Sequence, residues 1–153
     1  MEVLELQEIL DVACRLTAAA VVGAAVGLNR ELYNKQAGLR TQSLVAIGCA
    51  LIVVCGNATL THSEIVGPEG VSRALQGIFS GIGFIGAGVI LRDAAKGEVV
   101  GLTTAASIWV SAGLGVSCGL GLWTIAVVAT AITLTVLVAG QWFEDRVVEK
   151  FKK

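Results

Sequence analysis

The hydropathy of the chain alternates between long apolar runs and short polar segments. A membrane-spanning helix rises about 1.5 Å per residue and needs about 20 mostly apolar residues. The first three runs of suitable length cover residues 9–28, 41–61 and 72–91. The pattern therefore predicts a polytopic membrane protein built from α-helices.

The last apolar run, residues 99–143, has no charged side chain and is 45 residues long. As one helix it would extend about 68 Å, which is more than twice the thickness of the hydrocarbon layer. The segment SCGLGL at residues 117–122 has two glycines and few large side chains, so we expect the chain to turn there. This predicts a fourth span at 100–116, a fifth at 120–142, and an all-α bundle of five transmembrane helices.

The distribution of basic residues orients the five expected spans. Nine of the eleven Lys and Arg residues lie in the loops and tail on one side, and only Arg15 and Arg73 lie on the other. Cytoplasmic loops are enriched in Lys and Arg, so the N-terminus is expected outside and the C-terminus in the cytoplasm. We expect a transmembrane domain at residues 1–143 and a short charged cytoplasmic tail at 144–153.

Composition narrows the function classes. Charged residues make up 15% of the chain, whereas soluble domains carry about 25%. The net charge of −1 gives no indication of a nucleic-acid partner. His62 is the only histidine, and the four cysteines form no CxxC motif, so we expect no metal site, no cofactor, no catalytic triad and buried free thiols.

The stretch SGIGFIGAG contains the spacing G-x-G-x-x-G at Gly81, Gly83 and Gly86. A dinucleotide site needs this motif between a strand and a helix, and no βαβ pattern is present. On a helix, Gly77, Gly81 and Gly88 share one face, and Gly83 and Gly86 lie on roughly the opposite face. Small residues allow membrane helices to approach closely, so we expect this span at the centre of the bundle.

Gly23 and Gly27 form a second small-residue pattern, GxxxG, in the first span. We expect it to pack against the glycine-rich span. Two smooth faces on one helix of a small chain also indicate a homo-oligomer, most simply a dimer.

Two polar stripes with i, i+3, i+7 spacing follow the third and fourth spans. Their members are Arg73, Gln76 and Ser80, and Thr104, Ser107 and Ser111 with Thr103 adjacent. Polar side chains in membrane helices face the interior of the bundle or a cavity. Hydrogen bonding between helices and a functional polar cavity both remain open. Asp11 and Arg15, four residues apart, are expected to pair.

The loop between the first two spans carries a mixed polar set: Asn29, Arg30, Glu31, Arg40 and Thr41. One interpretation is a loop that fixes orientation and contacts anionic lipid heads. The other is a recognition surface for a partner protein or an anionic ligand. The sequence does not separate them.

Four segments together resemble the MgtC/SapB family of bacterial membrane proteins. They are GAAVGLNRE (23–31), AGLRTQSLVAIG (37–48), SGIGFIGAGVILR (80–92) and GLTTAASIWVSAGLG (101–115). The resemblance implies a five-span inner-membrane bundle, a role in growth at low magnesium and, in pathogens, survival inside host cells. It also implies a link to restraint of the F-type ATP synthase.

Two departures from the family pattern bear on function. Asn29 stands where the motif usually has glutamate, which removes an acidic group and weakens a divalent-cation site. Many members carry a soluble C-terminal domain, whereas this sequence ends shortly after Trp142, so we expect the short form. We expect a non-enzymatic regulatory protein in the lipid bilayer acting on a membrane partner. The alternative is a transporter or channel for magnesium or another small cation.

Overall fold

The structure is a computed structural model that describes residues 6–62, 68–92 and 98–151. The expectation of an all-α fold is confirmed, and one short β-hairpin that was not expected is added to it. The elements in chain order are α1 (Leu6–Leu32), α2 (Leu39–His62), α3 (Pro68–Val89), β1 (Leu91–Arg92), β2 (Val99–Val100), α4 (Leu102–Gly119) and α5 (Trp123–Phe151).

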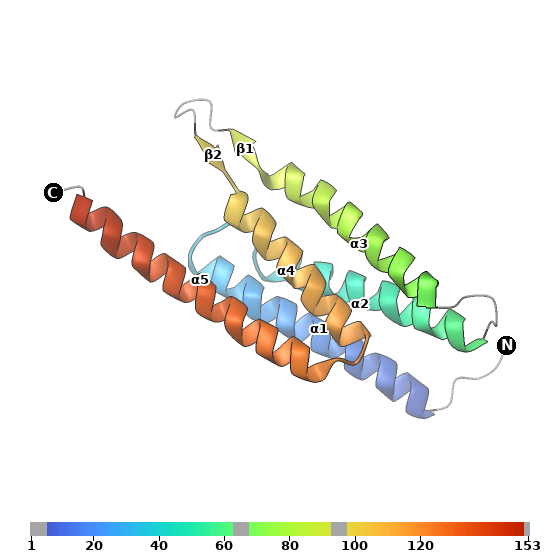
Figure 1. Cartoon of the computed structure of the whole chain (residues 1–153). Coiled ribbons are helices and arrows are strands. Elements are labelled where there is room, and N and C mark those ends of the chain that lie inside the picture. The colour runs from blue at the N-terminus through green and yellow to red at the C-terminus, as the bar shows by residue number, and fades with distance from the viewer. Residues whose placement is uncertain (1–5, 63–67, 93–97, 152–153) are drawn as a thin grey trace.

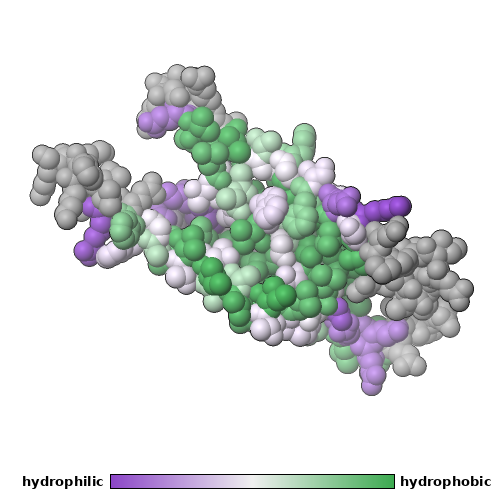
Figure 2. Space-filling view, in the orientation of Figure 1, coloured by the Kyte–Doolittle hydropathy of each residue, from purple (hydrophilic) through white to green (hydrophobic). Residues whose placement is uncertain are grey.

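Four of these helices, α1, α2, α4 and α5, are long and apolar enough to cross a membrane. Within the described ranges, α3 does not meet that standard, because Arg73 and Gln76 lie in its first half and glycines contribute little hydropathy. Large hydrophobic side chains such as Phe84, Val127 and Val136 are exposed on the outer surface. Figure 2 shows hydrophobic residues over the middle of the visible face and hydrophilic residues near both ends of the helices. The exterior is therefore suited to a lipid bilayer.

The helices are arranged around a core of three. α1, α2 and α4 pack closely on one another, α5 lies against α1 and α4, and α3 packs chiefly on α4 and α2 (Figure 1). α3 and α5 thus occupy opposite edges of the bundle in this view. The expectation that the glycine-rich span lies at the centre is wrong for the single chain.

Glycines make the close contacts of the three-helix core. A methyl group added at Gly23 would lie 2.7 Å from the carbonyl oxygen of Gln42, and one at Gly27 would lie 2.5 Å from the Cα of Leu39. The GxxxG pattern of α1 therefore contacts α2, whereas α3 had been expected. Gly115 and Gly119 of α4 also lie close to the backbone of α2, so α2 is held between two glycine-bearing faces.

The glycines of α3 have a different environment. A methyl group at Gly77, Gly81, Gly83 or Gly88 would meet no atom within 4 Å, and one at Gly86 would touch the Cβ of Ala105 at 3.6 Å. All of these glycines are helical, so the G-x-G-x-x-G spacing does not form a phosphate-binding loop. Within one chain, most of the α3 glycine surface is uncovered.

The turn expected within residues 117–122 is confirmed, since α4 ends at Gly119 and α5 begins at Trp123. Gly121 has φ 73°, a left-handed conformation that glycine adopts without steric cost. Arg15 of α1 donates a hydrogen bond of 2.8 Å to the carbonyl oxygen of Gly119 and pairs with Asp11 at 2.7 Å. The expected Asp11–Arg15 pair is therefore present, and it also ties α1 to the end of α4.

The β-hairpin joins α3 to α4. Leu91 pairs with Val100 and Arg92 with Val99 in an antiparallel register. Gly101, with φ 94°, follows β2 and directly precedes α4, and a side chain there would collide with the carbonyl oxygen of Val89. At the other end of the chain, α5 continues to Phe151, so no helix end marks the expected boundary at residue 143.

Candidate functional site

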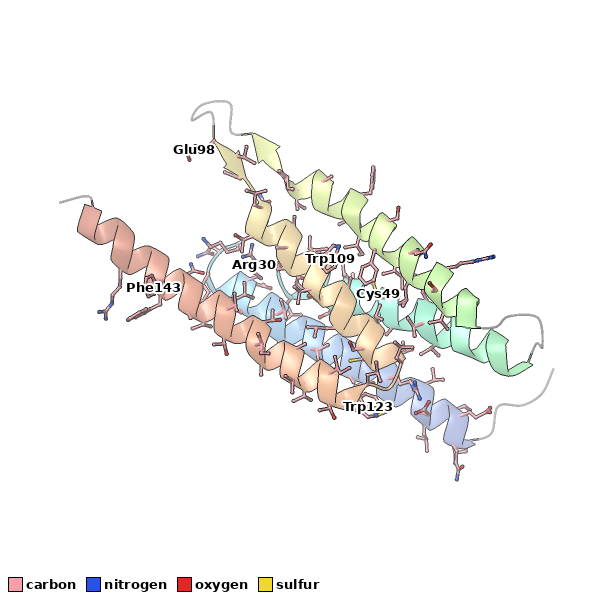
Figure 3. All side chains as sticks on the ribbon, in the orientation of Figure 1. Arg30, Cys49, Glu98, Trp109, Trp123 and Phe143 are labelled. Atoms are coloured by element: carbon pink, nitrogen blue, oxygen red, sulfur yellow. The ribbon has the colours of Figure 1, made fainter. Side chains whose placement is uncertain are left out.

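Buried polar side chains gather where α1, α2 and α4 meet. Among the described residues, the buried polar or charged side chains are Arg30, Gln42, Thr104, Ser107 and Ser111. Figure 3 labels Arg30 beside the start of α4. We call this set the polar cluster. It includes three of the four residues expected on the polar stripe of α4, whereas Thr103 is exposed.

A chain of hydrogen bonds connects four of the five residues of the polar cluster across the three helices. The guanidinium Nη2 of Arg30 donates to Thr104 Oγ1 at 2.5 Å, which joins α1 to α4. Gln42 Nε2 donates to Ser107 Oγ at 2.8 Å, which joins α2 to α4, and lies 3.3 Å from the carbonyl oxygen of Ala37. Ser107 Oγ in turn donates to the carbonyl oxygen of Thr104 at 2.8 Å. These contacts support hydrogen bonding between helices as one role of the α4 stripe.

Three buried polar atoms of the cluster have no hydrogen-bond partner in the described structure: Arg30 Nε, Gln42 Oε1 and Ser111 Oγ. Most buried polar atoms in native proteins are paired, and leaving one unpaired costs about 1–3 kcal/mol, more for a charged group. The Nε of Arg30 is therefore a buried polar atom whose hydrogen-bonding capacity is unused within the described structure.

A cavity of about 710 Å³ lies next to Arg30, between the end of α1, the start of α4 and the second half of α5. One part of its lining carries basic, amide or hydroxyl groups, and another part is apolar. The polar and basic side chains belong to Asn29, Arg30, Asn34, Lys35, Gln36, Thr103, Thr104 and Gln141, and the apolar ones include Val99, Val100, Val136 and Leu137. No carboxylate is among its lining residues in the described part of the chain.

The first turn of α4 forms part of the cavity wall. Gly101 stands at the N-cap position with no side-chain hydrogen bond to the helix, and the first turn contains no acidic residue. The N-terminus of a helix carries unpaired N–H groups and a partial positive charge. Arg30, Lys35 and this helix end therefore give the cavity a positive character.

The structure divides the loop residues that the sequence had grouped together. Asn29 and Arg30 line the cavity. Glu31 points elsewhere, and its Oε2 accepts a hydrogen bond of 3.0 Å from the backbone N–H of Leu39. Glu31 and Arg40 border a separate, smaller pocket of about 320 Å³, and Thr41 is exposed.

The polar stripe of α3 is not part of the polar cluster. Arg73, Gln76 and Ser80 are all exposed, and Gln76 Nε2 lies 3.5 Å from Ser72 Oγ on the same helix. The expectation that this stripe faces the interior is wrong for the single chain, because α3 packs on α4 through another face. Phe79 of α3 stacks on Trp109 of α4 with ring centroids 5.1 Å apart.

Sequence reasoning missed Gln42, Lys35 and the amides of the α1–α2 loop. Gln42 lies in the motif AGLRTQSLVAIG, inside the second expected span. An amide side chain within a membrane-spanning helix is a signal of a functional or interhelical contact, and it could have identified Gln42. The thiols also differ from expectation: Cys49 and Cys118 are buried, but Cys14 and Cys55 are exposed on the bundle surface.

Several membrane-compatible helices around a buried polar cluster define a polytopic helical membrane protein with a positively charged cavity beside that cluster. Residues 16–146 match the MgtC family, which covers most of the chain. The chain belongs to the MgtC family. The resemblance seen in the four sequence motifs is thereby confirmed.

Curated relatives support the assignment. The chain is 42% identical over 134 residues to "Protein SrpB" of Synechococcus elongatus, covering 84% of this chain and 74% of that protein. It is 45% identical over 119 residues to "Protein MgtC" of Salmonella typhimurium, covering 78% of this chain and 48% of that one. A "Protein MgtC" of Brucella abortus is 42% identical over 124 residues, with 81% and 48% covered.

The chain thus spans about half the length of its relatives named MgtC and about three quarters of SrpB. Among solved structures, none matches the chain.

Proposed function

We propose that this protein is a non-enzymatic regulator of the MgtC type in the bacterial inner membrane. It takes part in adaptation to low magnesium by contacting a membrane protein, and the F-type ATP synthase is the partner we favour. For pathogenic species the proposal extends to survival inside host cells. The observation that carries it is membership of the MgtC family together with relatives named MgtC at 42–45% identity.

In this proposal all five helices cross the membrane, with the N-terminus outside and the C-terminus in the cytoplasm. The surface for a partner is α3, because its glycines and the side chains of Gln76 and Ser80 are exposed in the single chain. The exposed surface of α3 combines these groups with Phe84 and Ile85, and its glycines allow another membrane helix to approach closely. The simplest partner for this surface of α3 is a second copy of the chain, which would give a dimer.

Transport of magnesium or another small cation is the alternative. Its support is the hydroxyl and amide groups buried in the polar cluster between three helices. Against it, Arg30 lies in the same cluster, and among the described residues its side chain has no carboxylate partner. A fixed positive charge repels a divalent cation and favours an anion instead.

A complementation experiment tests the regulatory proposal. A bacterial strain lacking its own MgtC-type protein is grown at low magnesium with this chain or with an empty vector, and ATP hydrolysis is assayed in inverted membrane vesicles. We expect the chain to restore growth and to lower ATP hydrolysis. Uptake of Mg²⁺ by purified protein in liposomes, without an effect on ATP hydrolysis, would favour the alternative.

A further inference from the structure

We propose that the cavity beside Arg30 binds a phosphoryl group, supplied either by a soluble phosphate compound or by the head of an anionic phospholipid. This inference concerns a ligand of the single chain and does not depend on the regulatory proposal. It rests on a buried unpaired cation, an uncapped helix end and an amphipathic cavity that contains both.

The first observation is the state of Arg30. Arg30 is only 4% exposed. Its Nη2 donates a hydrogen bond to the neutral hydroxyl of Thr104, and its Nε has no hydrogen-bond partner within the described structure. A buried charge is costly unless it is paired with an opposite charge. Because the cavity walls offer no carboxylate among the described residues, the counter-charge is expected to come from a bound anion.

The second observation is the start of α4. Leu102, Thr103 and Thr104 form its first turn, all three line the cavity, and no side chain caps them. Helix N-termini bind phosphate and similar anions through their unpaired backbone N–H groups and the helix dipole. An 18-residue helix supplies the full effect. Arg30 and the helix end therefore act on the same space.

The third observation selects phosphate chemistry over a simple halide. Arginine forms bidentate, charge-assisted bonds with phosphate oxygens. Lys35 supplies a second cation, and Asn34 and Thr103 supply polar groups around the same cavity. These donors come from several elements, so they can surround a group with several oxygens.

The fourth observation concerns the rest of the ligand. Val136 and Leu137 of α5 contribute an apolar wall to the same cavity. A phospholipid would place its head near Arg30 and its glycerol or acyl region along this wall. A soluble phosphate compound would use the basic end alone. Both ligands would bind through the phosphoryl group, and only the phospholipid would also contact the apolar wall.

The experiment needs a variant that blocks the site and keeps the fold. Thr103→Glu places a carboxylate in the first turn of α4 at an exposed position, where the helix dipole favours a negative charge. The new carboxylate lies in the cavity lining and competes with any anion. Lys35→Gln removes the second cation, and Arg40→Gln is the matched control, because Arg40 is exposed near the same loop but borders the other pocket.

The measurements use purified full-length chain in a neutral detergent. Thermal unfolding is followed by tryptophan fluorescence during titration with inorganic phosphate, against sodium chloride at equal ionic strength. A parallel titration uses mixed micelles with phosphatidylglycerol, against phosphatidylcholine. We expect a saturable rise in melting temperature with phosphate or with phosphatidylglycerol. A response to phosphate identifies a soluble source, and a response to phosphatidylglycerol alone identifies lipid.

Variants decide whether the response belongs to this cavity. Relative to the parent, we expect Thr103→Glu to weaken binding about tenfold or more and Lys35→Gln to weaken it several-fold, while Arg40→Gln changes it by less than about twofold. No saturable response to either probe in the parent would overturn the proposal. An equal loss of binding affinity in Lys35→Gln and Arg40→Gln would also overturn the proposal, because that result indicates general attraction of the anion to a basic surface.

Discussion

Two glycine-rich regions of this protein behave in opposite ways. In the three-helix core, Gly23, Gly27 and Gly115 bring backbones so close that no side chain fits between them. In α3, Gly77 and Gly81 face open space. The same residue type therefore builds an internal interface in one place and leaves a bare surface in the other. Glycine spacing alone identifies a smooth face, and only the neighbouring helices show whether that face is used inside one chain.

We expect the largest effect on stability from a substitution in the three-helix core. Gly27→Ala would place a methyl group 2.5 Å from the Cα of Leu39 and 2.8 Å from the carbonyl oxygen of Gly38, so backbone must move. Overpacking of this kind costs about 1–3 kcal/mol and sometimes more. We expect a clear fall in melting temperature in detergent. Gly77→Ala is the matched control in α3 and should melt at or above the temperature of the parent, because alanine favours a helix more than glycine does. Equal losses in the two variants would show that the core and α3 do not differ.

The next effect concerns the polar cluster that joins the core helices. Ser107→Ala removes the hydroxyl that accepts from Gln42 and donates to the carbonyl oxygen of Thr104. Leaving buried groups unpaired costs about 1–3 kcal/mol, so we expect a lower melting temperature, usually by less than for Gly27→Ala. Thr135→Ala removes an exposed hydroxyl on α5 and should change stability by less than about 0.5 kcal/mol. If Ser107→Ala leaves the melting temperature unchanged, the polar cluster does not hold the core together.

A smaller effect is expected at the turn between α4 and α5. Arg15→Gln breaks the pair with Asp11 and the bond to the carbonyl oxygen of Gly119. The side chain of Arg15 is 23% exposed and that of Asp11 54%, so the ion pair itself contributes little. We expect a loss of about 1 kcal/mol, mostly from the helix-end bond. Asp11→Asn, which leaves that bond in place, should cost less; the reverse order would assign the effect to the ion pair.

The smallest effect on the single chain is expected on α3. Gly81→Leu adds a side chain at a position where nothing lies within 4 Å of the new Cβ. The stability of the detergent-purified monomer should therefore fall by no more than about 0.5 kcal/mol, and the higher helix propensity of leucine acts in the opposite direction. The same change should reduce crosslinking between copies in intact membranes if α3 is the oligomer surface. If Gly81→Leu does not affect crosslinking, α3 is not part of the proposed interface. If Gly81→Leu lowers the stability of the monomer as much as Gly27→Ala does, α3 is not uncovered in the single chain.

The sequence predicted those features that depend on length and periodicity. The apolar run of residues 99–143 was too long for one helix, and the turn was found at its two glycines. The spacing of Thr104, Ser107 and Ser111 predicted one face, and the structure buries all three. Both inferences need only the geometry of a single helix.

Features that depend on which helices meet were not predicted. The polar stripe of α3 has the same spacing as that of α4, yet it is exposed, because helix periodicity defines a face without naming its neighbour. Gly115 and Gly119 were passed over although they have the same GxxxG spacing as Gly23 and Gly27. The cavity combines residues from α1, its following loop, α4 and α5, and no local pattern connects segments so far apart.

The helices of this bundle differ greatly in length, and that difference bears on how it sits in lipid. α4 has 18 residues and α5 has 29, which correspond to about 27 Å and about 44 Å along their axes. One is slightly shorter than a typical hydrocarbon layer and the other is much longer, so in a bilayer that both helices cross, α5 would tilt or project beyond the layer. Because α5 continues past the cavity from Gln141 to Phe151, the start of α4 is recessed below the end of α5. Thinning or thickening the bilayer would therefore change the depth at which lipid head groups meet this recess.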